Sequence, residues 1–395
     1  MKKSLLAALA VTVAGGAAAI IPMTASNAAV ACAPAWSASA VYTASNQASQ
    51  SGHNYTAKWW TQNESPATHS GQWDVWADNG ACGGGTTDPT TPPTTPPTTQ
   101  PPSTGTKMAS APYIYPGWGN PPAPSTVMNA TGIKAFTIAF VLANGCNPVW
   151  DGEGGLTGGV HASTINAIKA AGGSVVPSIG GWSGNKLGPN CSTPEALAGA
   201  YQKVIDAFGL QAIDIDIENT DEFENTVVQD RILNALKIVK QKNPSVKTIL
   251  TFGTSPTGPN YYGTRLVQQA KALGANIDIF TQMPFDFGGG SDMYGATVGA
   301  SEGLKNLLKT TFGYTDAQAY SHMGISGMNG LSDQQELTST DTWTRIRDYA
   351  KTNNFARFTF WAVNRDRGCA GGGVVSDCSG IAQGDWDFTR ISAGF

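Results

Sequence analysis

Residues 212–218 read Ala-Ile-Asp-Ile-Asp-Ile-Glu, and apolar and acidic side chains alternate along this stretch with a period of two. Successive side chains of a β-strand point to opposite faces of the sheet. A strand here therefore carries its isoleucines on one face and its acids on the other. We call Asp214, Asp216 and Glu218 the acid row.

Seven further short apolar runs rich in β-branched residues surround this stretch: 112–115, 135–142, 174–179, 248–252, 277–282, 320–325 and 358–363. Helical patterns lie between several of them, at 193–208, 224–242, 262–273 and 301–310. Strands that alternate with helices predict an α/β fold, here a (β/α)8 TIM barrel. The isoleucines should then face the helices, and the acid row should point into the barrel with Glu218 at its mouth. An edge strand with its polar face in water is the alternative, and it suits a lone acid better than three.

The acid row is expected to do acid–base chemistry, because barrel active sites lie at the C-terminal ends of the strands. Buried like charges raise one another's pKa, which leaves a carboxyl protonated near neutral pH. Most retaining glycosidases set two carboxylates on opposite sides of the scissile bond, whereas alternate residues of one strand share one side. The pattern thus favours one proton donor with two helpers and a nucleophile that belongs to the substrate.

This stretch resembles the fourth-strand signature of family 18 glycoside hydrolases, which runs Asp, two residues, Asp, one residue, Asp, one residue, Glu. The acid row matches the last three places, and Gln211 stands where the family usually has its first Asp. The departure puts a supporting contact in doubt and leaves the acids in place.

Three other segments resemble the same family in the order of its strands. Ser178-Ile179-Gly180-Gly181-Trp182 resembles the third-strand motif, whose glycines leave room for substrate. Gln282-Met283-Pro284-Phe285-Asp286 stands at the sixth strand, with Phe285 in place of a Tyr that often holds an N-acetyl group. Trp361 matches a tryptophan floor beneath the reacting sugar. The resemblance implies a catalytic set made of Asp214, Asp216 and Glu218. It also implies a substrate-binding set made of Ser178, Gly180, Gly181, Trp182, Gln282, Met283, Asp286 and Trp361.

The resemblance also implies a chitinase that acts on chitin and chito-oligosaccharides. Glu218 would protonate the glycosidic oxygen while the acetamido oxygen of the substrate attacks the anomeric carbon. Asp216 would orient the acetamide, and Asp214 would share a proton or hydrogen bond with Asp216. Two alternatives remain: an endo-β-N-acetylglucosaminidase that cuts N-glycans, and a lectin of this fold, although such lectins usually replace the Glu.

The first 107 residues divide into three segments by composition. Residues 1–29 have two lysines, an Ala-rich apolar stretch and then small residues, which predicts a secretory signal peptide. Residues 30–83 are rich in Trp and Tyr and predict a carbohydrate-binding module. Residues 84–107 contain mainly Thr and Pro, which favour polyproline II and predict a linker to the catalytic domain at 108–395.

Within the small module, Ala57-Lys58-Trp59-Trp60-Thr61 resembles the carbohydrate-binding modules of bacterial chitinases and cellulases. The resemblance implies a three-stranded sheet and gives Trp59, Trp60 and Trp73 as contacts to a crystalline polysaccharide. For any one Trp, packing inside a mini-protein is the competing explanation.

Six cysteines in an exported chain predict three disulfides, and fifteen pairings are formally possible. Position in the sequence favours Cys32–Cys82 around the small module, Cys369–Cys378 around a short Gly-rich loop, and Cys146–Cys191. A lipid anchor on Cys32 is a weaker alternative.

The composition of the chain argues against two other classes of partner. Because only 13% of the residues are charged, the net charge is -4 and basic clusters are absent, nothing favours nucleic acid or membrane as a partner. We expect a secreted, soluble monomer without cofactor or metal, since CxxC motifs are absent and the four His residues are scattered.

Overall fold

The computed structural model describes residues 30–38, 40–71, 74–82 and 107–395. It divides into two compact units, the first ending at Thr95 and the second beginning at Pro96. The predicted signal peptide and nearly all of the predicted linker lie outside the described residues, as does Trp73.

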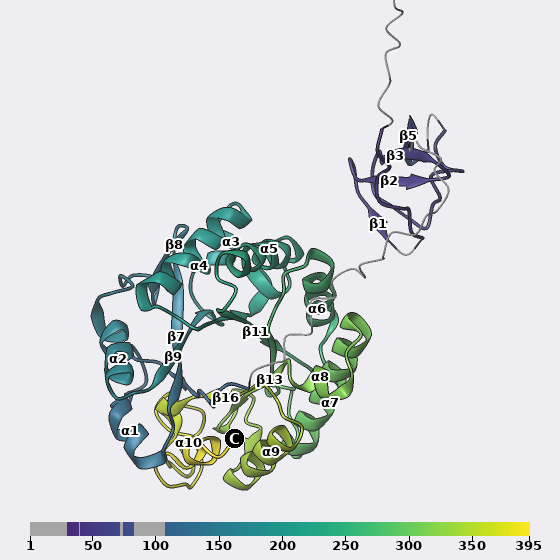
Figure 1. The fold of residues 1–395 in the computed structure, drawn as a ribbon. Coiled ribbons are helices and arrows are strands. Elements are labelled where there is room, and N and C mark those ends of the chain that lie inside the picture. Colours follow the sequence, from purple (N-terminus) through teal and green to yellow (C-terminus); the bar gives the residue numbers. More distant parts are fainter. Residues whose placement is uncertain (1–29, 39, 72–73, 83–106) are drawn as a thin grey trace, which may run out of the picture. The chain divides into compact units, whose positions relative to one another are not determined.

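The first unit is a small antiparallel β-structure (Figure 1). Three strands form its sheet in the order β2 (Gln47–Gln50), β3 (His53–Ala57) and β5 (Trp76–Ala81). A separate pair joins β1 (Val41–Tyr42) to β4 (Thr61–Gln62). The three-stranded sheet is as predicted. Its core is built around Trp76, which is fully buried, with Tyr55 and two alanines.

The second unit is a TIM barrel, as predicted, with its helices outside the ring of strands (Figure 1). Neighbouring barrel strands are parallel. The eight strands are β6 (Tyr113–Ile114), β7 (Ala135–Asn144), β9 (Ser174–Gly180), β10 (Ala212–Ile217), β11 (Lys247–Gly253), β12 (Ile279–Met283), β13 (Met323–Met328) and β16 (Arg357–Trp361). The chain before β6 closes the ring, because Met108 N and Ala111 N donate to carbonyls of Ala356 and Phe358.

Helices follow most of the strands. They are α1 (Pro124–Thr131), α2 (Gly159–Ala170), α3 (Leu187–Asn190), α4 (Pro194–Phe208), α5 (Thr226–Lys242), α6 (Tyr261–Leu273), α7 (Met293–Phe312), α8 (Asp316–Tyr320), α9 (Thr340–Thr352) and α10 (Asp387–Ser392). A π-helical turn, η1 (Asn219–Phe223), follows β10, and a 3-10 turn, η2 (Val363–Arg365), follows β16. Strand β8 (Asn147–Trp150) makes a hairpin with β7, and β14 (Gly330–Leu331) pairs with β15 (Leu337–Thr338) beyond β13.

Local sequence sets the bounds of these helices. In α4 the Thr193 side chain accepts a hydrogen bond from Ala196 N, Pro194 occupies the first turn, and Gly209 ends the helix in a left-handed conformation. These are the residue types that fit those positions, since Pro lacks the N–H that a first turn leaves unpaired and Gly tolerates positive φ.

All three predicted disulfides are present: Cys32–Cys82, Cys146–Cys191 and Cys369–Cys378. The pairing of Cys32 leaves no thiol for the alternative of a lipid anchor. Among the helices that the structure describes, none is both long and apolar enough to cross a bilayer.

Candidate active site

A cavity of about 910 Å³ opens at the C-terminal ends of the barrel strands. Asp216 and Glu218 line it, as do Trp182, Met283, Asp286 and Trp361 from the predicted set. The period-two pattern of the acid-row strand explains this placement. Ile213, Ile215 and Ile217 are buried in the core, while the acids lie on the inner face.

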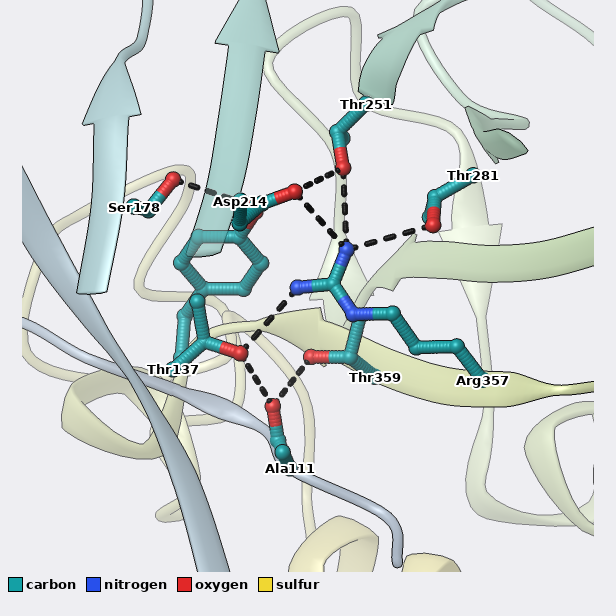
Figure 2. Close-up of polar contacts among 9 residues, drawn as sticks. Ala111, Thr137, Ser178, Asp214, Thr251, Thr281, Arg357 and Thr359 are labelled. Carbon is teal, nitrogen blue, oxygen red and sulfur yellow. Dashed lines mark hydrogen bonds and ion pairs between the residues drawn. The ribbon is translucent and has the colours of Figure 1, made fainter. Parts of the chain in front are cut away.

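Asp214 is the deepest member of the acid row and is fully buried. Its Oδ2 accepts hydrogen bonds from the hydroxyls of Tyr113 (2.7 Å) and Ser178 (2.9 Å). Its Oδ1 accepts from Thr251 Oγ1 (2.6 Å) and from Arg357 Nη1 (3.1 Å), as Figure 2 shows. These four donors come from four other barrel strands, so Asp214 ties the interior of the barrel together.

The guanidinium of Arg357 is the positive centre of this interior network (Figure 2). It is fully buried, and its Nη1 also donates to Thr251 Oγ1 (2.9 Å) and Thr281 Oγ1 (3.2 Å). Its Nη2 donates to Thr137 Oγ1 (3.1 Å). Buried charges persist in proteins when they are paired and hydrogen-bonded in this way.

None of the hydrogen bonds that Asp214 makes within the described chain goes to Asp216. The expectation that Asp214 shares a proton or hydrogen bond with Asp216 stays a prediction. Each Asp214 oxygen accepts hydrogen bonds from two donors. Asp214 thus anchors its strand to four other strands of the barrel.

The next two acids are in an environment that favours their protonated forms. Burial, followed by the charges of Glu218 and Asp214, raises the pKa of Asp216 well above its usual range. Within the described residues Asp216 Oδ1 has no hydrogen-bond partner. Burial likewise raises the pKa of Glu218 to about 7, with Lys186 acting against the rise and Asp286 and Asp333 adding to it. Glu218 is thus suited to give up a proton near neutral pH.

The cavity wall that carries Asp286 is held by Glu336, which is almost completely buried. The Glu336 carboxylate accepts hydrogen bonds from the backbone N–H groups of Asp286 (2.7 Å), Phe287 (2.7 Å) and Gly289 (3.0 Å). Asp286 Oδ1 in turn accepts from Gln334 N (3.1 Å). The loop after β12 and the β14–β15 turn are therefore joined through two carboxylates, those of Glu336 and Asp286.

No family model matches the chain. A probable bifunctional chitinase/lysozyme of Escherichia coli is 26% identical over 280 residues, which cover 66% of this chain and 31% of that protein. Endochitinase 11 of Metarhizium anisopliae is 26% identical over 275 residues, covering 66% of this chain and 53% of that protein. Active domain 2 of a chitinase from Pyrococcus furiosus has the same fold, with a TM-score of 0.67 and 25% identity over 73% of this chain and 94% of that domain.

The chain has chitinase homologues in sequence and in structure. It spans about a third to a half of the length of the two curated relatives.

Four predicted substrate-binding residues of this chitinase-like barrel do not line the cavity: Ser178, Gly180, Gly181 and Gln282. Ser178 donates to Asp214, and the Gln282 amide contacts Ser301 of α7. Gly180 has φ +113°. A Cβ there would collide with the backbone carbonyl of Asp216, so this glycine makes room for the neighbouring strand and not directly for a ligand.

Sequence reasoning missed several residues that line the cavity of the barrel, namely Tyr113, Tyr115, Phe140, Met328, Asp333 and Gln334. Tyr113 and Tyr115 lie at the end of a predicted strand, where an alternating aromatic pattern could have pointed to them. Asp333 and Gln334 lie in a turn between two short strands and carry no such signal. Trp118 also lines the cavity and is half exposed, whereas Trp150 is buried.

The two residues that depart from the family pattern, Phe285 and Gln211, lie in different parts of the barrel. Phe285 lines the cavity, so the missing hydroxyl bears directly on the site. Gln211 is exposed and precedes β10, at the opposite end of the strand from Glu218.

In the small unit, Trp59 and Trp60 are 48% and 60% exposed. Exposed indoles can stack on the flat faces of sugar rings. Among the described residues no group of three or more His, Cys, Asp and Glu side chains could hold a metal ion.

Proposed function

We propose that this protein is a secreted chitinase that cleaves β-1,4-linked N-acetylglucosamine polymers with retention, through an oxazolinium intermediate formed by the substrate. The observation that carries the proposal is the acid row, whose last two members line the cavity of a barrel with chitinase homologues. The related domain of the Pyrococcus furiosus chitinase has been crystallised with chito-oligosaccharides.

In this mechanism Glu218 donates its proton to the glycosidic oxygen, and its raised pKa of about 7 keeps it protonated in much of the population at neutral pH. Asp216, two residues away on the same strand face, accepts the acetamide N–H and stabilises the positive charge of the oxazolinium ion. Its Oδ1 is buried and has no hydrogen-bond partner among the described residues, so turning the side chain toward the cavity would break no hydrogen bond of that atom. Asp214 holds the strand in place from below.

Product stereochemistry tests the proposal. Hydrolysis of chitohexaose, followed by NMR or chromatography that resolves anomers, should release the β-anomer first. The cavity also contains Asp286 and Asp333, and a carboxylate across the cavity could instead activate water. Prompt appearance of the α-anomer would mean inversion and would rule out the acetamido group as nucleophile.

We also propose that residues 30–83 are a chitin-binding module that raises the concentration of the enzyme at an insoluble surface. A Trp59→Ala, Trp60→Ala double variant should lose several-fold in activity on crystalline chitin and keep its activity on soluble oligomers. Rates on both substrates and sedimentation with chitin measure this. Trp76, which is fully buried, must be left intact so that the unit stays folded. An equal loss on both substrates would contradict the proposal.

Three disulfides support secretion, because disulfides persist in oxidising compartments. The proposed signal peptide at 1–29 and the proposed linker at 84–107 follow from composition alone.

A further inference from the structure

Lys186 is buried directly behind the acid row. Its side chain is 1% exposed, and its Nζ forms an ion pair with Asp221 Oδ1 at 2.9 Å. The same Nζ donates to the main-chain carbonyl of Glu218 at 3.4 Å. Lysine is rarely so buried unless its charge is paired. One of the groups that Lys186 contacts here is the backbone of the proposed proton donor.

Hydrogen-bonded backbone and acidic side chains surround Lys186. Lys186 immediately precedes α3, and its carbonyl accepts a hydrogen bond from Asn190 Nδ2 at 2.8 Å. Glu222 of η1 is buried beside it and accepts from Gly188 N at 3.2 Å. The π-helical turn η1 begins directly after Glu218, so Lys186 joins the loop after β9 to the turn that follows the acid row.

The charges that surround Glu218 come from several elements. The charged and titratable groups are Lys186 before α3, Asp216 on β10, Asp221 and Glu222 on η1, Asp286 after β12, and Asp333 between β14 and β15. All except Lys186 are acids. An ammonium group in that position offsets repulsion that would otherwise act on the ionised form of Glu218.

On the basis of the proposed function, we propose that Lys186 is a positioning residue for the reaction. Its buried ammonium holds the main chain at Glu218 and sets the electrostatic environment in which Glu218 gives up and regains its proton.

The charges around Glu218 predict the direction in which each substitution shifts the pKa of Glu218. Burial is the main cause that raises the pKa of Glu218, and Lys186 is the main cause that lowers it. Removing the Lys186 charge should therefore raise this pKa further. Removing the Asp221 charge should lower it, because the ammonium then acts on Glu218 without its counter-anion. A purely structural role would not give two shifts of opposite sign.

The experiment measures kcat/KM against pH on a soluble chito-oligosaccharide. The basic limb, where Glu218 loses its proton, should lie near pH 7 in the unaltered protein. In Lys186→Met it should move up by about one pH unit, and in Asp221→Asn it should move down by a few tenths of a unit. Lys186→Arg keeps the charge and should leave the limb where it is.

Two outcomes overturn the inference: basic limbs that stay in place in Lys186→Met and Asp221→Asn, or limbs that move in the same direction. If Lys186→Met does not fold, Asp221→Asn decides alone, because the Asp221 side chain is 43% exposed and its replacement is tolerable. A Glu218→Gln protein that keeps its activity would instead overturn the proposed function, so the two failures are distinguishable.

Discussion

Glu218→Gln is expected to lower kcat on chito-oligosaccharides by about 100- to 10,000-fold, the usual contribution of a general acid. Gln keeps the shape of the side chain and lacks the proton that the leaving oxygen needs. Glu218 lines the cavity and its pKa is raised to about 7 by burial, which makes it the group in the acid row best suited to donate near neutral pH. Steady-state kinetics with circular dichroism and thermal unfolding measure activity and fold together.

The matched control is Glu224→Gln, six residues further along the chain. Glu224 lies outside the cavity lining and is exposed, so its variant should keep full activity. Near-normal kcat in a folded Glu218→Gln protein would mean that another group protonates the substrate.

Arg357→Met is expected to destabilise the barrel by about 3–5 kcal/mol, because it leaves the buried carboxylate of Asp214 without its counter-charge. For a domain of this size the melting temperature should fall by on the order of 10 °C. Thermal and urea unfolding measure the effect. The loss of three threonine hydrogen bonds adds to it.

Two further variants separate charge from packing. Arg357→Met combined with Asp214→Asn should recover part of the lost stability, since no unpaired charge remains. Arg390→Met removes an ion pair with Asp387 at the surface and should change the free energy of unfolding by at most about 1 kcal/mol. If Arg357→Met lowered the free energy of unfolding no more than Arg390→Met does, the interior network would contribute little to the stability of the barrel.

The strands of the barrel were predictable because seven of them are short apolar runs rich in β-branched residues and the eighth alternates with a period of two. The acid-row strand shows this best, since only one face of a barrel strand can hold three acids while the other meets the helices. The eight predicted strands overlap the observed ones, with bounds that differ by a few residues. Trp361 and Asp286 were found through resemblance, and both line the cavity.

The features of the site that could not be predicted depend on contacts between segments far apart in the sequence. Arg357 begins a strand and has no sequence signal for its pairing with Asp214, 143 residues earlier. Lys186 reads as an ordinary loop lysine until the fold buries it. The glycines of the third-strand motif were expected to make room for substrate, but at Gly180 the neighbour is the backbone of β10. Sequence shows which residue types are present, while the closure of the ring decides which of them meet.

The Glu336 carboxylate binds three backbone N–H groups of the loop after β12, and Asp286 in that loop has a left-handed backbone at φ +56°. Such a conformation costs about 1 kcal/mol for a residue with a side chain, so the hydrogen bonds to Glu336 hold a strained segment in place. The cavity wall that carries Asp286 is consequently preorganised before any sugar arrives. A ligand that binds does not have to rearrange this wall. The free-energy cost of the strained backbone arises when the protein folds and not when the ligand binds.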